Sequence, residues 1–212
     1  VRVCLGAMSA EAARRLLSDY VGCRLAALVG AAVPVCSLVT VRDGARRSVG
    51  VATEWAEADI RVDLRDCATT SPPMARSTKV LTALAAIRVA DTWTMNWDRW
   101  NGKNVLVRLA CDAGFSFIDF DQAFLSKASW AEGKPRLHWL DGGFDDAWLS
   151  DRELLSGVAG IEGRQQAPHY ADARRLLEGM SESALQVVLA TVPEEWLGAA
   201  WPSARPDDLR ER

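Results

Sequence analysis

The sequence predicts an α+β fold with two lobes, a small mixed lobe over residues 1–75 and a larger, mainly helical lobe over residues 76–212. Apolar residues in the first part follow helical spacing and then strand spacing, whereas most segments of the second part have helical spacing. The prolines Pro72-Pro73 lie in a polar stretch between the two parts. With 212 residues, of which 49% are hydrophobic, the chain can bury a substantial core without disulfides or a structural metal.

The first part is expected to contain a strand, a helix and two further strands. Ser9 is a typical N-cap for a helix over residues 10–29, and Gly30 is a typical stop. Four apolar residues at helical spacing should form the buried stripe of this helix: Leu17, Val21, Leu25 and Leu28. Short strands are predicted at 1–5, 35–41 and 48–53, with a turn at Asp43-Gly44 and an irregular stretch over 54–76.

The second part is expected to begin with a helix over residues 77–90, followed by a polar loop over 91–104. Two short strands should come next, at 105–110 and 115–120, on either side of a turn at Gly114. The glycine and proline content of residues 126–151 is typical of a loop. The remaining segments favour helices, at 150–160, 169–179 and 182–191, with a last turn or helix around Trp196 and a polar tail from Pro202.

Charge and composition argue against several classes of partner. The net charge is −3 and the basic residues are scattered, whereas nucleic-acid-binding domains typically carry a basic stripe. No apolar run approaches the length of a membrane-spanning helix, and no secretory signal peptide is expected. The five cysteines are dispersed without CxxC spacing, so neither a zinc site nor a disulfide framework is predicted. We therefore expect a cytoplasmic protein without a nucleic-acid or membrane partner.

The segment that says most about function is the polar loop together with the acidic end of the strand that follows it. Asp98 and Asn104 lie in the loop, and Asp119 and Asp121 end the second strand. Phosphoryl transfer needs one carboxylate at the attacking hydroxyl, and a second carboxylate with an amide to hold Mg²⁺ against the phosphates. A hairpin flanked by a loop can bring such groups to one cleft. The pattern predicts Asp98 at the hydroxyl, Asn104 and Asp119 at the metal, and Asp121 as a supporting residue.

These residues also have structural interpretations. Asp and Asn are common in turns, so any single one of them is more often structural than catalytic. A catalytic role is favoured by the order in which the motifs occur together: a D-R-x-x-x-x-N loop precedes a strand, a turn and an I-D-F strand end. Three tryptophans beside the loop either pack it against the helical part or form a partner surface: Trp93, Trp97 and Trp100.

The loop and the strand end resemble the catalytic segment of the HipA-like kinases, which share their fold with protein kinases and phosphatidylinositol kinases. Residues 17–34 resemble the regulatory helix of that family and the turn after it, and residues 190–197 resemble its "iP-x-x-W" segment. The resemblance implies a protein-kinase-like two-lobed fold, with a reduced N-terminal lobe and a mainly helical, catalytic C-terminal lobe.

The resemblance also implies roles for single residues. Asp98 would be the catalytic acid or base, and Arg99 would organise the loop around it. Asn104 and Asp119 would bind magnesium. Asp91 and Asn96 fit the supporting positions upstream of the loop.

The spacing within the loop departs from the pattern of many kinases. Asp98 and Asn104 are six residues apart, and a spacing of five would place Lys103 at the metal instead. A bulge at Asn101-Gly102 would restore Asn104, and this is the interpretation we prefer.

The N-terminal part departs from the pattern as well. Kinases hold the phosphates of ATP with a Gly-rich loop and a strand lysine that pairs with a helix glutamate, and neither the loop nor the lysine is evident here. Cys4 stands at the expected lysine position and Arg2 is the cation nearby, so Arg2 is the candidate for ATP binding. Its candidate partners are Asp19 and Glu11.

The expected function is that of an ATP- and magnesium-dependent phosphotransferase, a HipA-like serine/threonine protein kinase with an antitoxin-like regulator as a candidate partner. The alternative is a catalytically inactive pseudokinase that acts as a protein-binding module. A lipid kinase would need a basic membrane-facing patch, which the sequence does not show. A Ser-His-Asp hydrolase is disfavoured because no G-x-S-x-G motif accompanies the two histidines, His138 and His169.

Overall fold

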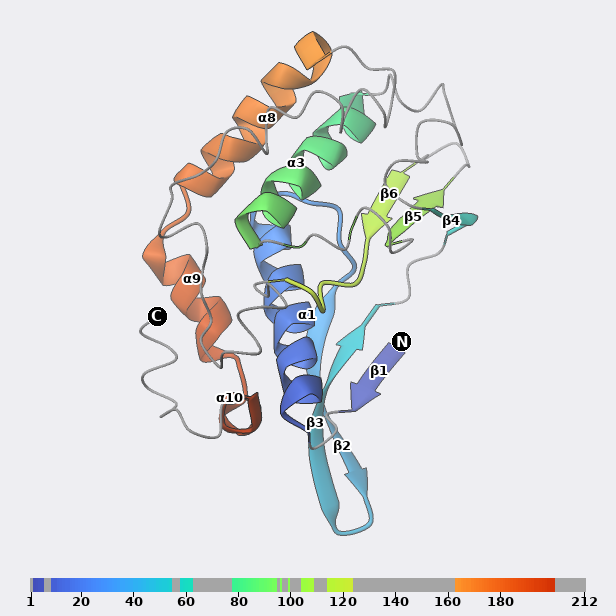
Figure 1. Ribbon diagram of the computed structural model, residues 1–212, viewed down its shortest axis with the longest axis vertical. Coiled ribbons are helices and arrows are strands. Elements are labelled where there is room, and N and C mark those ends of the chain that lie inside the picture. Colours follow the sequence, from blue (N-terminus) through green and yellow to red (C-terminus); the bar gives the residue numbers. More distant parts are fainter. Residues whose placement is uncertain are drawn as a thin grey trace.

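The computed structural model describes residues 2–5, 9–54, 58–62, 78–94, 96, 99, 104–108, 114–123 and 163–200. Within these ranges the chain forms five helices and two three-stranded sheets, so the predicted α+β class is confirmed (Figure 1). No helix in these ranges is both long and apolar enough to cross a membrane.

The first sheet contains the strands predicted in the N-terminal part. These are β1 (Arg2–Leu5), β2 (Cys36–Asp43) and β3 (Arg46–Thr53). Both outer strands pair antiparallel with β3, which gives the order β1-β3-β2. The β2–β3 hairpin turns at Gly44, whose φ of +57° is one that residues with a side chain rarely adopt.

Helix α1 (Ala10–Leu28) connects β1 to β2 and begins and ends where the sequence predicts. The Ser9 hydroxyl accepts a hydrogen bond from the Ala12 amide at 3.2 Å, and Gly30 ends the helix with a φ of +81°. The predicted apolar stripe is wrong at Leu28, which is 40% exposed. Because α1 packs against the first sheet and against three other helices, its buried face is wider than one stripe and includes Leu16, Tyr20 and Cys23.

The second sheet is formed by β4 (Ile60–Val62), β5 (Val105–Arg108) and β6 (Gly114–Phe117), in the order β4-β5-β6. Strands β5 and β6 were predicted, although Gly114 begins β6 instead of forming the turn. Strand β4 lies in the stretch expected to be irregular, since three residues are too few for a periodic pattern. It pairs antiparallel with β5, from Ile60 opposite Val107 to Val62 opposite Val105. The second sheet therefore contains residues from both of the predicted parts, whose division at residue 75 stays a prediction.

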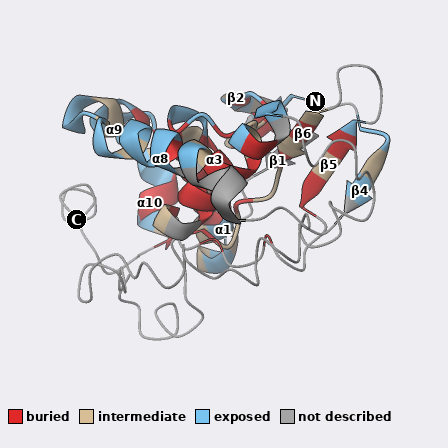
Figure 2. Ribbon diagram, turned by 90° about the horizontal axis from the view of Figure 1, so that it is seen from above, coloured by how far each residue is buried: buried red, intermediate tan, exposed pale blue. Residues whose placement is uncertain are grey.

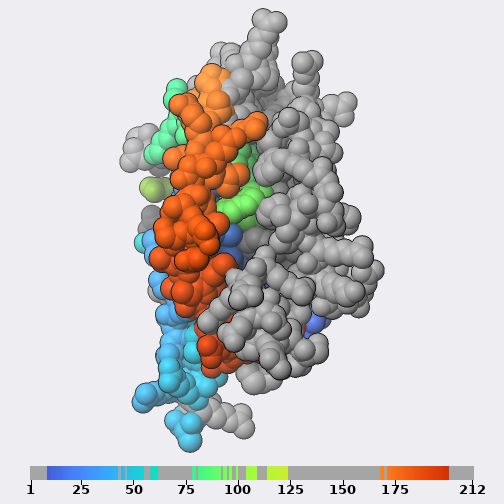
Figure 3. All heavy atoms as spheres, turned by 90° about the vertical axis from the view of Figure 1, so that its left-hand side faces the viewer, coloured from blue at the N-terminus to red at the C-terminus, as the bar shows by residue number. Residues whose placement is uncertain are grey.

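Four further helices complete the described structure: α3 (Thr78–Thr94), α8 (Gly163–Glu178), α9 (Glu182–Ala190) and α10 (Glu194–Ala200). The sequence predicts all four, but α3 continues to residue 94 and α8 begins before residue 169. Helix α8 lies along α3, and α9 and α10 follow it down the same side of the molecule (Figures 1 and 3). The predicted loop over 126–151, the predicted helix over 150–160 and the tail from Pro202 lie outside the described residues.

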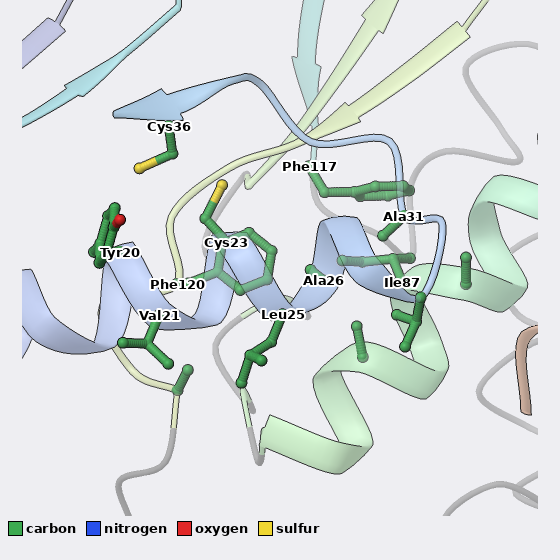
Figure 4. Close-up of a cluster of buried hydrophobic side chains, with 14 of the residues drawn as sticks. Tyr20, Val21, Cys23, Leu25, Ala26, Ala31, Cys36, Ile87, Phe117 and Phe120 are labelled. Carbon is green, nitrogen blue, oxygen red and sulfur yellow. The ribbon is translucent and has the colours of Figure 1, made fainter. Parts of the chain in front are cut away.

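The core lies where α1 meets α3 and the end of β6 (Figures 2 and 4). Ile87 of α3 and the rings of Phe117 and Phe120 are at most 1% exposed. Trp196 of α10 joins the C-terminal helices to this core. Its ring packs edge-on against Tyr20 of α1, and its indole N–H donates to the Val49 carbonyl of β3 at 3.3 Å.

Gly22 allows the close approach of α1 to the segment that follows β6. A Cβ at this glycine would lie 2.8 Å from the Cβ of Phe120 and 3.1 Å from that of Ala123, too close for the present packing. We predict that Gly22→Ala lowers the free energy of unfolding by about 1–3 kcal/mol, as overpacking of a core does. Chemical denaturation measures the change.

Gly198 provides the matched control, because a Cβ there would have no described atom within 4 Å apart from its chain neighbours and the backbone of its own helix. Gly198→Ala should leave stability unchanged or raise it by about 0.5–1 kcal/mol, since alanine favours a helix over glycine. Equal effects of the two substitutions would contradict the close packing described for Gly22.

Candidate functional site

The acidic segment, which we define as residues 118–121 with Asp119 and Asp121, begins where β6 ends. The amide of Phe117 donates to the Ala32 carbonyl at 2.8 Å, which fixes the end of the strand against the link between α1 and β2. Asp119 then has a φ of +66°, in the left-handed region that residues with a side chain rarely enter. Aspartate tolerates this conformation better than most residues, and such backbone is typical of functional sites. The turn directs the chain back toward α1.

Asp19 of α1 holds the acidic segment from the other side. Its Oδ1 accepts a hydrogen bond from the amide of Phe120 at 2.8 Å, and the Phe120 ring is buried in the core beside α1 (Figure 4). Asp19 is also a predicted partner of Arg2. Arg2 lies in β1 opposite Thr53, and its side chain is outside the described part of the structure. The structure thus brings Asp19 to the acidic segment, while its pairing with Arg2 stays a prediction.

Arg99 forms a buried ion pair with Asp91 at the end of α3. Its Nε and Nη2 donate to the two carboxylate oxygens of Asp91, at 3.0 and 3.2 Å, and both side chains are almost fully buried. Asp91 also accepts from the Asn96 side-chain amide at 3.1 Å. Burial raises the pKa of the Asp91 carboxyl, and the charge of Arg99 acts in the opposite direction.

The same guanidinium connects the polar loop to the acidic segment. Nη1 of Arg99 donates to the Asn104 carbonyl at 3.1 Å and to the Ile118 carbonyl, and the guanidinium lies 4.5 Å from the centre of the Phe120 ring. The Ile118 amide in turn donates to the Asn104 carbonyl at 3.1 Å. Arg99 therefore fixes the distance between the start of β5 and the residue that precedes Asp119. Its role in organising the loop around Asp98 stays a prediction, because residues 97, 98 and 100–103 lie outside the described part of the chain.

A cavity of about 590 Å³ opens beside the acidic segment. Such a volume is typical of small-molecule sites. Its walls combine apolar side chains with charged ones from α1, from β4 and its preceding residues, and from the end of β6. The charged residues among those described are five acids and two arginines: Asp19, Glu54, Asp59, Asp119, Asp121, Arg15 and Arg61. The excess of carboxylates favours a ligand that brings a cation.

The environment of Asp121 in the cavity changes the pKa of its carboxyl. Burial and the negative charge of Asp119 raise the pKa of Asp121 to about 6, although hydrogen bonding to Gln122 and the charge of Arg15 lower it. The Gln122 amide donates to Asp121 at 3.1 Å, and Arg15 approaches it at 3.5 Å. Two carboxylates that repel each other in this way would both be stabilised by a divalent cation between them.

The donor set fits magnesium in part. Asp119 and Asp121 offer the hard oxygen ligands that Mg²⁺ prefers, and the cavity has room for the waters that this ion retains. Asn104, the predicted third ligand, is 1% exposed, and its Oδ1 accepts a hydrogen bond from Arg61 at 3.3 Å. No group of three or more His, Cys, Asp or Glu side chains able to hold a metal occurs in the described ranges. A magnesium ion would therefore depend on the two aspartates, with Asn104 able to join only if Arg61 moves.

The remaining predicted residues can be placed only in part. Asp98, the predicted catalytic residue, and Lys103, the alternative metal ligand, lie outside the described residues. Sequence reasoning missed Arg15 and Arg61. Arg15 precedes Asp19 by four residues on α1, a spacing that places both on one face and could have indicated it. Nothing in the sequence indicated Arg61, because β4 itself was not predicted.

Two buried cysteines also contribute to the cavity wall. Cys23 of α1 and Cys36 at the start of β2 are free thiols, as expected for dispersed cysteines (Figure 4). Hydrogen bonding with Cys36 and burial raise the pKa of the Cys23 thiol above its usual range. Cys23 therefore stays protonated and has the character of a core residue, not of a nucleophile.

No protein-family model matches the chain, and no curated sequence is significantly similar to it.

The Arg99–Asp91 pair should dominate the stability of this region. We predict that Arg99→Ala lowers the free energy of unfolding by about 3–5 kcal/mol, because it leaves the buried Asp91 carboxylate without the guanidinium that donates two hydrogen bonds to it. As a control, Arg174→Ala removes an exposed helix ion pair with Glu178 and should cost less than about 1 kcal/mol. Urea denaturation measures both, and similar losses for the two variants would show that Arg99 has no special role.

The raised pKa of Asp121 predicts a pH dependence. The folded pKa of about 6 exceeds the ordinary value of 3.8, so the folded state binds the proton more tightly. The contribution to stability is fully present below about pH 4 and is lost as the pH rises through about 6. Denaturation between about pH 4 and 7 should show a larger fall in unfolding free energy for the unmodified chain than for Asp121→Asn. Parallel curves would show that folding does not raise the pKa of Asp121, by burial or by the charge of Asp119.

Proposed function

We propose that this chain is an ATP- and magnesium-dependent phosphotransferase, similar to the HipA-like kinases, that acts on a serine or threonine hydroxyl of a protein. The observation that carries the proposal is the contact between Arg99 and the two motifs on which the resemblance depends. Arg99 follows Asp98 directly, and its guanidinium binds the backbone at Asn104 and at Ile118, next to Asp119. Motifs separated by about a dozen residues in sequence are thereby held together beside one cavity.

The order of the elements supports a protein-kinase-like arrangement. The strand β1, the helix α1, the β2–β3 hairpin and the short strand β4 are followed by the helix α3, the β5–β6 pair and the acidic segment. The sequence between α3 and β5 is polar. Kinases use the same order for the parts that hold ATP and the metal, with the catalytic aspartate in the loop and the metal-binding aspartate after the hairpin. In the proposed arrangement the first sheet with α1 forms a reduced N-terminal lobe, and the cavity lies between it and the second sheet.

The described side chains indicate which residues would bind the metal, position the site and contact the nucleotide. Asp119 and Asp121 would hold magnesium, which when bound neutralises negative charge on the phosphate groups and so makes their transfer easier. Asp19 fixes the backbone amide after Asp119 and thereby positions that carboxylate. The apolar part of the wall, from Leu16, Leu106 and Phe117, would exclude water from one side of a bound nucleotide. Asp98 would orient the hydroxyl that attacks.

Binding of ATP tests the proposal directly. Thermal melts of the full chain with ATP and Mg²⁺ should show a rise of about 2.7 kcal/mol in stability at ~100 times the dissociation constant, or about 5–10 °C. Asp119→Asn should abolish most of this rise. Asparagine also tolerates the left-handed conformation of residue 119, so the substitution removes the charge without new backbone strain.

Two further measurements distinguish an active kinase from an inactive, protein-binding module. Asp98→Asn should retain binding of ATP but lose transfer of radioactive phosphate to protein, as expected for a kinase. Binding of ATP without transfer by the unmodified chain would support the inactive, protein-binding alternative. If ATP and magnesium leave the melting temperature of the folded chain unchanged at millimolar concentration, the proposal is wrong.

A further inference from the structure

Arg61 has no role in the predicted site, yet it lies inside it. The residue is on β4, and its side chain lines the cavity together with Asp119. Its Nη2 donates to Oδ1 of Asn104 at 3.3 Å. This is the oxygen that Asn104 would offer to magnesium if it served as a metal ligand. A protein cation thus occupies the predicted ligand atom.

A guanidinium and a magnesium ion cannot share this oxygen without strong repulsion. Magnesium binds oxygen at close range in a nearly ideal octahedron, which would place two like charges within a few ångströms of each other. Because Asn104 is 1% exposed, its side-chain amide has little room to turn away from Arg61. If the metal takes Oδ1, therefore, it is Arg61 that has to move.

Arg61 is placed so that it can move, and a nucleotide would give it a new partner. It is exposed and belongs to a short strand at the edge of the second sheet. A nucleotide in the cavity would bring phosphate groups, and the planar fork of arginine binds phosphate oxygens with two hydrogen bonds at once. The strand lysine that kinases use for this purpose is not evident in the sequence. Arg2 was named from the sequence as its replacement, but its side chain lies outside the described part of the structure, whereas the side chain of Arg61 lines the cavity.

We propose that Arg61 is the phosphate-binding cation of this site: it holds the Asn104 amide oxygen when no nucleotide is bound, and transfers to the nucleotide phosphates when the metal binds. The inference rests on the proposed function and adds to it a residue and a switch between two contacts. Arg15, the other described arginine of the cavity, already pairs with Glu11 at 3.0 Å and with Asp121 at 3.5 Å. Arg15 therefore serves to balance the acidic segment, whereas Arg61 contacts the predicted metal ligand itself.

The test measures two affinities that Arg61→Gln should change in opposite directions. Mn²⁺, a substitute for Mg²⁺ that paramagnetic resonance detects, should bind the nucleotide-free variant about threefold or more tightly than the unmodified chain, because a competing cation is gone. Binding of ATP in the presence of Mg²⁺, measured by calorimetry, should weaken about tenfold or more, the usual effect of losing a charged hydrogen bond. Arg108→Gln, on β5 and exposed outside this cavity, removes the same charge and should change neither affinity.

The outcomes separate this inference from the proposed function. If the unmodified chain binds ATP in a manner that requires Asp119 but Arg61→Gln binds both ligands normally, Arg61 has no such role while the proposed function stands. Arg61 is likewise excluded from this role if both affinities change in the same direction. If the unmodified chain binds neither ligand, both proposals fail. Should Arg61→Gln not fold, Arg61→Lys decides, because it keeps the charge but loses the fork, so only the affinity for ATP should fall.

Discussion

The buried ion pair between Arg99 and Asp91 is the interaction on which the rest of the site depends. A charge removed from water is costly unless it is paired and its donors are satisfied. Arg99 meets this requirement with two bonds to Asp91 and further bonds to the carbonyls of Asn104 and Ile118. The end of α3, the start of β5 and the end of β6 are held together as a consequence. The need to satisfy one buried guanidinium thus determines where the acidic segment lies.

The second constraint is the close approach of α1 to the acidic segment. Gly22 leaves room for Phe120, and Asp19, almost one helical turn earlier, accepts the Phe120 amide at 2.8 Å. With α1 on one side and Arg99 on the other, the backbone at Asp119 is held in a conformation that would be unfavourable by itself. The cost of that conformation is offset by packing and hydrogen bonds on both sides. Asp119 is therefore preorganised at the wall of the cavity before any ligand binds.

Much of the fold could be predicted because it depends on local signals. Ser9 and Gly30 mark the ends of α1, and alternating apolar residues mark β2 and β3. What escaped prediction depends on contacts between distant segments. Strand β4 has three residues and exists through its pairing with β5. Leu28 lies on the helical stripe but is exposed, because tertiary packing and not periodicity selects the buried face.

The distinction between local sequence signals and contacts of distant segments also applies to the candidate site. The motif pattern identified Arg99, Asn104 and Asp119 as a group, and the Arg99 guanidinium bonds to the backbone of Asn104 and of Ile118, the residue before Asp119. The pattern could not show that Asn104 is buried with its amide oxygen bonded to Arg61, since Arg61 comes from a segment 43 residues earlier. Nor could it show that Asp19 bonds to the acidic segment, 101 residues later. Polar contacts over such separations follow from the fold and have no signature in a single sequence.

The proposed function requires that Asp119 and Asp121 form the wall of a nucleotide and metal site. Nuclear magnetic resonance with Mn²⁺ and ATP tests this requirement most directly, because a bound paramagnetic ion broadens the amide signals nearest to it. We predict that the amides of residues 118–122 broaden first, followed by those at the start of β5, while the amides of α8 and α9 stay sharp. Broadening that begins instead at the exposed acids of α10, Glu194 and Glu195, or no selective broadening at all, would contradict a metal site at the two aspartates.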